Sequence, residues 1–152
     1  MRRNSSGRLF SNVLVAIDGS ESARAAAQVA VEMAARDRAR LTAVNVLHLP
    51  ATGIHPFTPA GYSEIIEEQK KDSRKWLGEI SKMAEEAGVE LKTEVLDGAE
   101  GIAPAIVGYA ESKKIDLIVM GTRGRSSLKR MLLGSVAQGV VTYAPCPVIV
   151  IR

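Results

Sequence analysis

Five short segments with the pattern of strands, separated by segments of helical length, limit the folds open to this chain of 152 residues. The strand patterns occupy residues 13–17, 41–47, 89–96, 115–120 and 148–151, and helical patterns occupy residues 20–38, 62–87, 102–113 and 136–143. Strands that alternate with helices form parallel sheets, because each right-handed crossover returns the chain to the same end of the sheet. The pattern therefore predicts an α/β fold with a single open five-stranded parallel sheet and helices on both faces.

Local patterns refine the prediction for three of these segments. The run at residues 13–17 is apolar throughout, which is typical of a strand covered on both faces, and Ser20 is expected to be the N-cap of the helix that follows it. Residues 89–96 alternate between apolar and charged positions, which indicates an edge strand with one covered face and one face in water. Residues 48–61 contain three prolines and two glycines, so we expect irregular structure there.

A glycine-rich stretch follows the apolar run at residues 115–120. It contains Gly121, Gly124, nine further residues, and then Gly134 and Ser135 at the start of a helical pattern. Glycines let the backbone approach an anion closely, and the amide groups at a helix N-terminus attract phosphate. Glycine-rich loops also form ordinary turns, but the preceding strand and the following helix favour a nucleotide phosphate site.

The spacing of these glycines resembles that of the universal stress protein family, whose ATP-binding members carry Gly, two residues, Gly, nine residues, and then Gly followed by Ser or Thr. The resemblance also covers residues 13–20 and 144–151, and it spans most of the chain from Asn12 onward. It implies a Rossmann-like sheet, similar to the adenine nucleotide alpha hydrolases, with strand order 3-2-1-4-5. That order places the ends of the first and fourth strands side by side, where the winding reverses and open sheets bind ligands.

The resemblance also implies which residues contact ATP. One of them, Ala137, departs from members that carry a hydroxyl residue there, so its contact is expected through the backbone alone. The residues that the resemblance assigns to the site are Ala16, Asp18, Val46, Gly121, Thr122, Arg123, Gly124, Arg125, Ser126, Ser127, Gly134, Ser135, Val136 and Ala137.

Each of these contacts has a physical role. Val46 is expected to offer backbone groups to the adenine edge, and Asp18 to accept hydrogen bonds from the ribose hydroxyls, although Asp18 is also a common helix cap. Gly124, Gly134 and Ser135 are expected to bring amides to the phosphates. The side chains of Arg123 and Arg125 either offset phosphate charge or belong to a solvated face, whereas those of Lys129 and Arg130 are expected on a solvated face.

The composition predicts one cytoplasmic domain. Residues 12–152 are expected to form it, and residues 1–11 are expected to be a polar, mobile extension. Three arginines in that extension account for the net charge of +3, so the body is neutral and nucleic acid is a poor candidate partner. A lone Cys146 excludes an intrachain disulfide, and no apolar run approaches the length of a membrane helix.

Catalytic and metal-binding patterns are absent from the sequence. It has no Walker A motif and no Ser/His/Asp set, and His48 and His55 have no partners at metal-ligand spacing. No carboxylate or histidine lies between Gly121 and Tyr143, so a bound ATP lacks an evident base, and Mg²⁺ is expected to bind through the phosphates.

Three functions fit these observations. The first is a dimeric stress-response module whose ATP occupancy alters its partners. The second is a slow ATPase or a phosphotransferase that uses Ser126, Ser127 or Ser135 as acceptor, and the third is a scaffold without a ligand. Residues 147–151 are apolar on both faces but are expected at the edge of the sheet, so we predict a homodimer that pairs this strand with its own copy.

Overall fold

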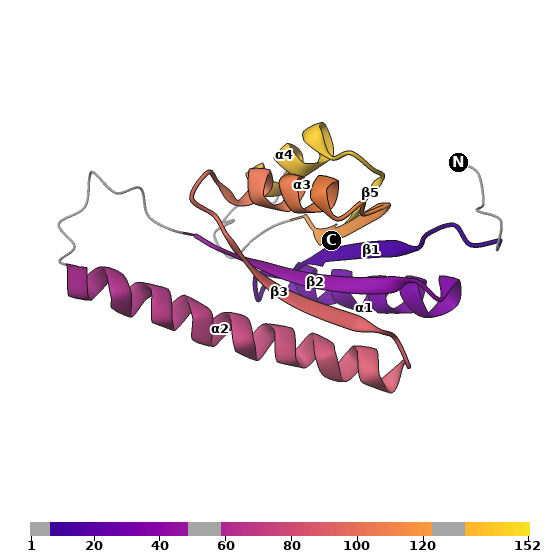
Figure 1. Cartoon of the computed structure of the whole chain (residues 1–152), viewed down its shortest axis with the longest axis horizontal. Helices are drawn as coiled ribbons and strands as arrows, with labels where there is room; N and C mark the ends of the chain where they lie inside the picture. Colours follow the sequence, from indigo (N-terminus) through magenta and orange to yellow (C-terminus); the bar gives the residue numbers. More distant parts are fainter. Residues whose placement is uncertain (1–6, 49–58, 123–132) are drawn as a thin grey trace.

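The computed structural model describes residues 7–48, 59–122 and 133–152, and these form one five-stranded parallel sheet with helices on both faces (Figure 1). Strands and helices alternate along the chain as the apolar pattern predicts. In chain order the elements are β1 (Asn12–Ala16), α1 (Glu21–Asp37), β2 (Arg40–Leu47), α2 (Pro59–Glu86), β3 (Leu91–Asp97), α3 (Ile102–Ser112), β4 (Leu117–Gly121), α4 (Ser135–Tyr143) and β5 (Val148–Ile151).

The strands lie in the order β3-β2-β1-β4-β5, which confirms the order implied by the family resemblance. All four pairings are parallel. The first crossovers lead outward from β1 to β2 and β3, and the later ones place β4 and β5 on the other side of β1. The chain therefore reverses its winding between β1 and β4, where the carboxyl ends of both strands meet.

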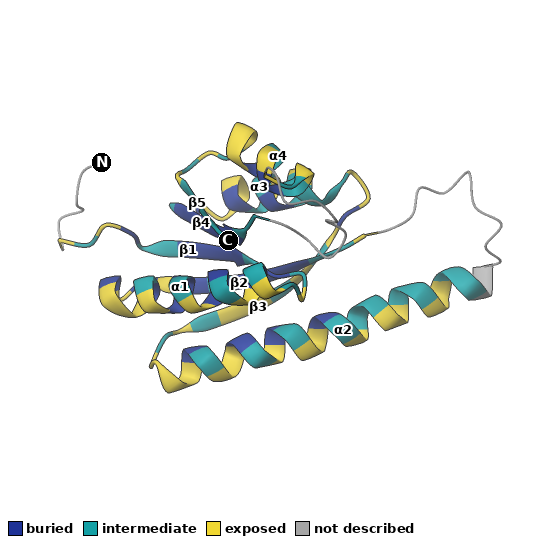
Figure 2. Ribbon diagram, turned by 180° about the vertical axis from the view of Figure 1, so that it is seen from behind, coloured by how far each residue is buried: buried dark blue, intermediate teal, exposed yellow. Residues whose placement is uncertain are grey.

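Two apolar cores cover the two faces of the sheet. Alternate residues of the central strands point to opposite faces, so that Val13 and Val15 of β1 join one core and Leu14 joins the other. Helices α1 and α2 pack on the first face, and α3 and α4 pack on the second (Figure 2). Within the described residues every helix is too short or too polar to traverse a bilayer.

The start of α2 and the exposure of β3 differ from the sequence predictions. Helix α2 begins at Pro59, three residues before the predicted start, because proline fits the first turn of a helix, where its missing amide hydrogen has no partner to lose. The alternation in β3 predicts a covered apolar face, but Val95 is 42% exposed. It borders a cavity of about 300 Å³ between α2 and β3, where Gly78 offers no side chain to cover it.

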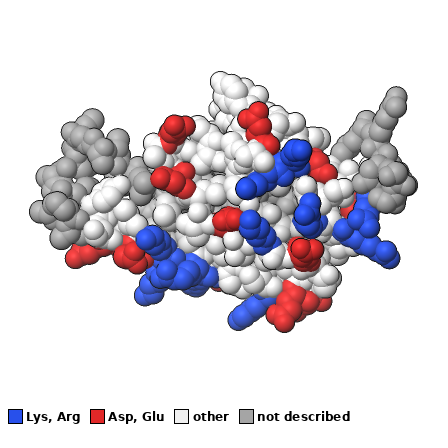
Figure 3. Space-filling model, viewed as in Figure 1, with Lys and Arg blue, Asp and Glu red and all other residues white. Residues whose placement is uncertain are grey.

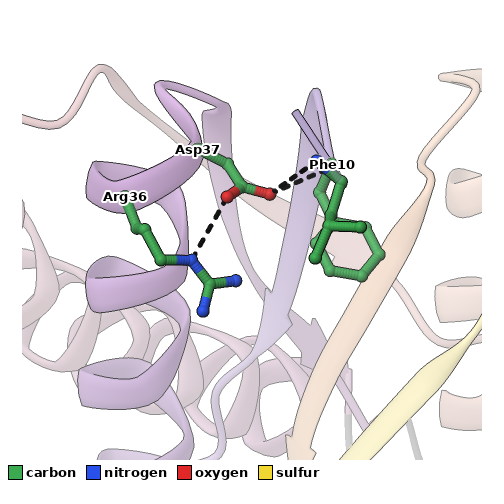
Figure 4. Close-up of polar contacts among 4 residues, drawn as sticks. Phe10, Arg36 and Asp37 are labelled. Carbon is green, nitrogen blue, oxygen red and sulfur yellow. Dashed lines mark hydrogen bonds and ion pairs between the residues drawn. The ribbon is translucent and has the colours of Figure 1, made fainter. Parts of the chain in front are cut away.

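The chain is anchored to the body before β1 begins. The Asp37 carboxylate, at the end of α1, accepts hydrogen bonds from the amides of Leu9 and Phe10 at 3.1 and 2.9 Å (Figure 4). Asp116 accepts the next two amides along the chain, and the Phe10 side chain is buried in the core. The last residues of the extension predicted at 1–11 therefore belong to the folded body.

Candidate functional site

The carboxyl ends of β1 and β4 lie next to each other at the reversal of winding. The register pairs Ala16 with Met120, so Asp18 and Thr122, two residues further along each strand, lie at the same level. The Thr122 amide donates to the Ile151 carbonyl at 2.8 Å, which holds the end of β4 in the sheet. Open α/β sheets bind ligands at this position, because the loops diverge and leave a crevice between them.

A tight turn follows β1 and fixes the position of Asp18. Gly19 has a φ of +80°, a conformation that favours glycine. The Asp18 Oδ1 atom accepts a hydrogen bond from the Ser20 amide at 2.9 Å, and the Ser20 hydroxyl accepts from the Ala23 amide at 3.2 Å. Ser20 is thus the N-cap of α1, as predicted, and Asp18 stabilises the turn from a half-buried position.

Two glycines allow close approach of neighbouring elements at this end of the sheet. A Cβ atom on Gly19 would lie 2.6 Å from the indole nitrogen of Trp76, so the α2 ring packs directly on the turn. A Cβ atom on Gly121 would lie 2.8 Å from the Ala23 nitrogen and from the Ser22 carbonyl carbon. The end of β4 therefore packs against the first turn of α1, and a larger residue would separate them.

The N-terminus of α4 opens at the same end of the sheet. The Gly134 amide donates to the Thr122 carbonyl at 2.7 Å, which brings the two ends of the glycine-rich stretch together. The Gly134 amide, for which the sequence predicts a phosphate contact, is therefore already bonded within the protein. The first helical bond runs from the Gln138 amide to the Gly134 carbonyl, and no side chain caps the helix. Its leading amides, which can donate to an anion, are those of Ser135, Val136 and Ala137.

Val46 lies at the end of β2, on the other side of β1. The register pairs Ala16 with Val44, which places Val46 level with Asp18. The structure thus brings Ala16, Asp18, Val46, Gly121 and Thr122 to one end of the sheet, together with the start of α4. The predicted site residues that lie outside the described residues are Arg123, Gly124, Arg125, Ser126 and Ser127.

Two residues that the sequence reasoning missed connect α2 to this end of the sheet. Asn45 of β2 is 5% exposed and donates to the Ile17 carbonyl at 2.6 Å, and it accepts a hydrogen bond from the fully buried Ser73. The signal for Asn45 was a polar residue inside an apolar strand. The signal for Ser73 was its place on the apolar face of α2, in helical register with Leu77 and Ile80.

Charges are mixed on the face seen in Figure 3, where acidic and basic side chains are interspersed. Among the described residues, no group of three or more His, Cys, Asp or Glu side chains could hold a metal ion. The described part of the site offers hydrogen-bonding groups, namely the main-chain donors at the start of α4 and the Asp18 carboxylate.

Comparison with known proteins identifies the family. Residues 9–152 match the universal stress protein family. The chain belongs to this family. It is 42% identical over 147 residues to universal stress protein MJ0531 of Methanocaldococcus jannaschii, a match that covers 95% of this chain and 83% of that protein.

Solved structures of universal stress proteins share the fold. UspA from Lactobacillus plantarum superposes with a TM-score of 0.81 and 36% identity, covering 94% of this chain and 98% of that one. The universal stress protein from Archaeoglobus fulgidus in complex with dAMP superposes with a TM-score of 0.67 and 24% identity, covering 95% and 99%. The fold and the family predicted from the sequence are thus confirmed.

Proposed function

We propose that this universal stress protein binds ATP in the crevice between the ends of β1 and β4, and that nucleotide occupancy regulates its interactions as a dimer. The observation that carries the proposal is that the Asp18 turn and the uncapped N-terminus of α4, which is bonded to Thr122 at the end of β4, lie at the same end of the sheet. A carboxylate there suits ribose hydroxyls, and main-chain amides suit phosphates. The Archaeoglobus relative in complex with dAMP supports an adenine nucleotide as the ligand class.

In this proposal the nucleotide lies across the ends of three strands. Val46 meets the adenine edge, Asp18 meets the ribose, and the amides at Ser135 and the two residues after it meet the phosphates. Gly121 and Thr122 border the pocket at the end of β4. Mg²⁺ would bind through the phosphates, which in nucleotide sites supply many of its ligands beside water.

Asp18 provides a test with a matched control at Asp97. Both carboxylates accept a hydrogen bond at 2.9 Å from the amide two residues further along, after β1 and β3 respectively. Asp97 ends β3, two strands from β1, so Asp97→Ala removes the same kind of local bond and leaves the carboxylate assigned to the ribose in place. Asp18→Ala should weaken ATP binding in calorimetry by roughly 10- to 100-fold, as expected for a lost hydrogen bond to a charged group, and Asp97→Ala should not. Equal affinities for the two variants would contradict the placement of ribose.

The phosphate end of the proposal has its own test. A bulky substitution such as Gly134→Leu should abolish ATP binding, because the side chain would enter the space before the first amides of α4. Mass spectrometry of small molecules released from the purified protein should identify an adenine nucleotide. Protein that carries none and binds no added ATP would favour a ligand-free scaffold instead.

A slow ATPase or phosphotransferase is the alternative function for the same pocket. The Ser135 hydroxyl supports this alternative, since it lies at the start of α4, where a phosphate would bind. Time-resolved ADP release should be slow or absent under the binding proposal. Transfer of labelled phosphate to the protein would favour the enzyme.

The edge at β5 supports the dimer. The Ile118 amide donates to the Pro147 carbonyl, and the Thr122 amide donates to the Ile151 carbonyl. Backbone groups alternate in direction along a strand, so those of Val150, directly before Ile151, point to the open edge. Tyr143 of the adjacent α4 is 74% exposed. Pairing with a second copy about a twofold axis would satisfy this edge.

The dimer is tested by light scattering at micromolar concentration, which should give twice the monomer mass of 16.3 kDa. Val150→Pro removes an outward amide and keeps the bonds to β4, so it should yield a monomer. A wild-type monomer would refute the dimer. A cytoplasmic location belongs to the same proposal and is supported by the unpaired Cys146.

A further inference from the structure

A buried polar pair joins α2 to the strand ends that carry the proposed site. Asn45 of β2 is 5% exposed and Ser73 of α2 is fully buried, and their side chains are hydrogen bonded to each other. Burying two polar groups costs free energy unless each finds a partner, and an apolar pair could fill the same space. Their hydrogen bonds offset that cost, and these bonds connect a side chain of α2 to the ends of two strands.

The acceptor at Ile17 fixes the orientation of the Asn45 amide. The Ile17 carbonyl can only accept, so the group 2.6 Å from it is the Asn45 NH₂. The Asn45 oxygen then faces Ser73, and the Ser73 hydroxyl donates to it. That hydroxyl also lies 2.9 Å from the Gln69 carbonyl, but its one proton serves a single acceptor at a time.

The pair lies next to the two residues that would hold the adenosine in the proposed site. Ile17 directly precedes Asp18, and Asn45 directly precedes Val46. Strand β1 ends at Ala16, so the Ile17 carbonyl lies beyond the β1 strand, and Asn45 supplies its partner. The Ile17 amide also donates to the Val44 carbonyl at 2.8 Å, so the Asn45 side chain adds a second bond from β2 to the same residue. This second bond helps to fix the distance between the ribose acceptor and the adenine edge, and the α2 hydroxyl helps to fix the rotamer of Asn45.

A second contact from the same helix holds the exit of β2. The Gln69 side chain accepts from the His48 amide and donates to the His48 carbonyl, each at 2.9 Å. Gln69 and Ser73 are one helical turn apart, so both lie on the face of α2 that meets β2. The residue after Asn45, Val46, is thus held between two contacts from one helix.

We propose that Asn45 and Ser73 are positioning residues for the adenosine half of the nucleotide site. The inference rests on the proposed function. It assigns to α2, which supplies none of the predicted nucleotide contacts, control over how tightly the base and ribose are bound. Binding of the phosphates, which the proposed function assigns to the start of α4, should not depend on this pair.

Ser73→Ala tests the proposal, with Ser81→Ala as the matched control. Both hydroxyls lie near the carbonyl four residues earlier, at 2.9 Å for Ser73 and 3.0 Å for Ser81, but Ser81 is exposed. Calorimetry with ATP and with inorganic tripolyphosphate separates the adenosine contribution from the phosphate contribution. Ser73→Ala should weaken ATP binding about tenfold, or about 1.4 kcal/mol, and leave tripolyphosphate binding unchanged. Ser81→Ala should change neither.

Asn45→Asp provides a second variant of nearly the same shape. Its carboxylate still accepts from Ser73 but cannot donate to the Ile17 carbonyl, so ATP binding should fall further than in Ser73→Ala. Fluorescence of Trp76, the single tryptophan, which packs on the Asp18 turn, verifies that each variant is folded.

Three outcomes would overturn the inference. An unchanged ATP affinity in folded Ser73→Ala, beside a wild type that binds ATP, would refute it and leave the proposed function intact. Equal weakening of ATP and tripolyphosphate binding would assign the pair a general structural role. A wild type that binds no ATP would refute both proposals.

Discussion

The Asp37 carboxylate provides a sharp test of how the start of the chain is held. Its Oδ2 atom accepts both the Leu9 and Phe10 amides, and its Oδ1 atom accepts from the Arg36 Nε atom at 3.2 Å (Figure 4). Asp37 is 7% exposed, and the Phe10 ring beneath it is part of the core. Removing the carboxylate therefore leaves the Phe10 amide without an acceptor in a buried position, whereas the Leu9 amide lies nearer to water.

The magnitude follows from the three bonds. The bond to the Phe10 amide is buried and joins a charged group, so it is worth about 1.5–3 kcal/mol, and the half-buried Leu9 bond adds about 0.5–1.5 kcal/mol. The Arg36 side chain is 61% exposed, so its ion pair contributes little. Asp37→Ala should lower the free energy of unfolding by about 2–4 kcal/mol, or about 5–15 °C in Tm for a chain of this size.

Asp37→Asn separates the charge from the hydrogen bonds. An Asn oxygen in place of Oδ2 can still accept both amides, and the Asn NH₂ would then face Arg36, which is exposed and can turn away. The loss should be about 1 kcal/mol, the difference between a charged and a neutral acceptor.

The pH dependence has a defined sign. Burial raises the pKa of Asp37, but the amides of Phe10 and Leu9 and the Arg36 guanidinium outweigh it and hold the pKa below the ordinary 3.8. A carboxyl whose pKa is lowered by folding stabilises the protein fully above its unfolded value. The advantage of wild type over Asp37→Asn should therefore be constant above about pH 5 and disappear as the pH falls below 3.8.

Urea unfolding of wild type and both variants between pH 3 and pH 7, followed by circular dichroism, measures these differences. An Asp37→Ala variant as stable as wild type at pH 7 would refute the anchoring role. An advantage over Asp37→Asn that grew at acid pH would refute the direction of the pKa shift.

Two further predictions concern glycine positions and the thiol. Gly121→Ala should lower the free energy of unfolding by about 1–3 kcal/mol, because the new methyl would lie 2.8 Å from the Ala23 nitrogen. Gly108→Ala should raise the free energy of unfolding by about 1 kcal/mol, because its new methyl would have no neighbouring atom within 4 Å and alanine favours a helix. Thermal unfolding compares them, and equal shifts would contradict the close packing of β4 on α1. Burial and the Asp116 carboxylate raise the pKa of the Cys146 thiol, so its alkylation at pH 7 should be slower than that of free cysteine and should accelerate at higher pH. A rate equal to that of free cysteine would contradict this.

Most of the fold follows from periodicity in the sequence. The order and type of the elements were predicted because buried parallel strands are apolar throughout and the helices carry one apolar stripe. The N-cap at Ser20 was predicted because a hydroxyl can accept an amide within a few residues of itself. The start of α2 at Pro59 was missed because proline both ends and begins regular structure.

The candidate site was only partly open to prediction. The spacing of Gly121, Gly134 and Ser135 indicated a phosphate loop and, through the family resemblance, the ligand class. The bond between the Gly134 amide and the Thr122 carbonyl was not foreseen, because it depends on how two distant ends of a segment meet. The exposure of Val95 was not foreseen either, since alternation marks the two faces of a strand but not which neighbour covers them.

The amino-acid pattern alone was enough for the elements and their order along the chain, because these depend on interactions between residues close in sequence, and the glycine spacing was enough for the resemblance to the family. Packing in three dimensions fixed the rest. The link from Ser73 through Asn45 to Ile17, and the approach of Gly121 to α1, join residues from separate elements. Such contacts exist only once the crossovers have placed those elements side by side, so no local pattern could reveal them.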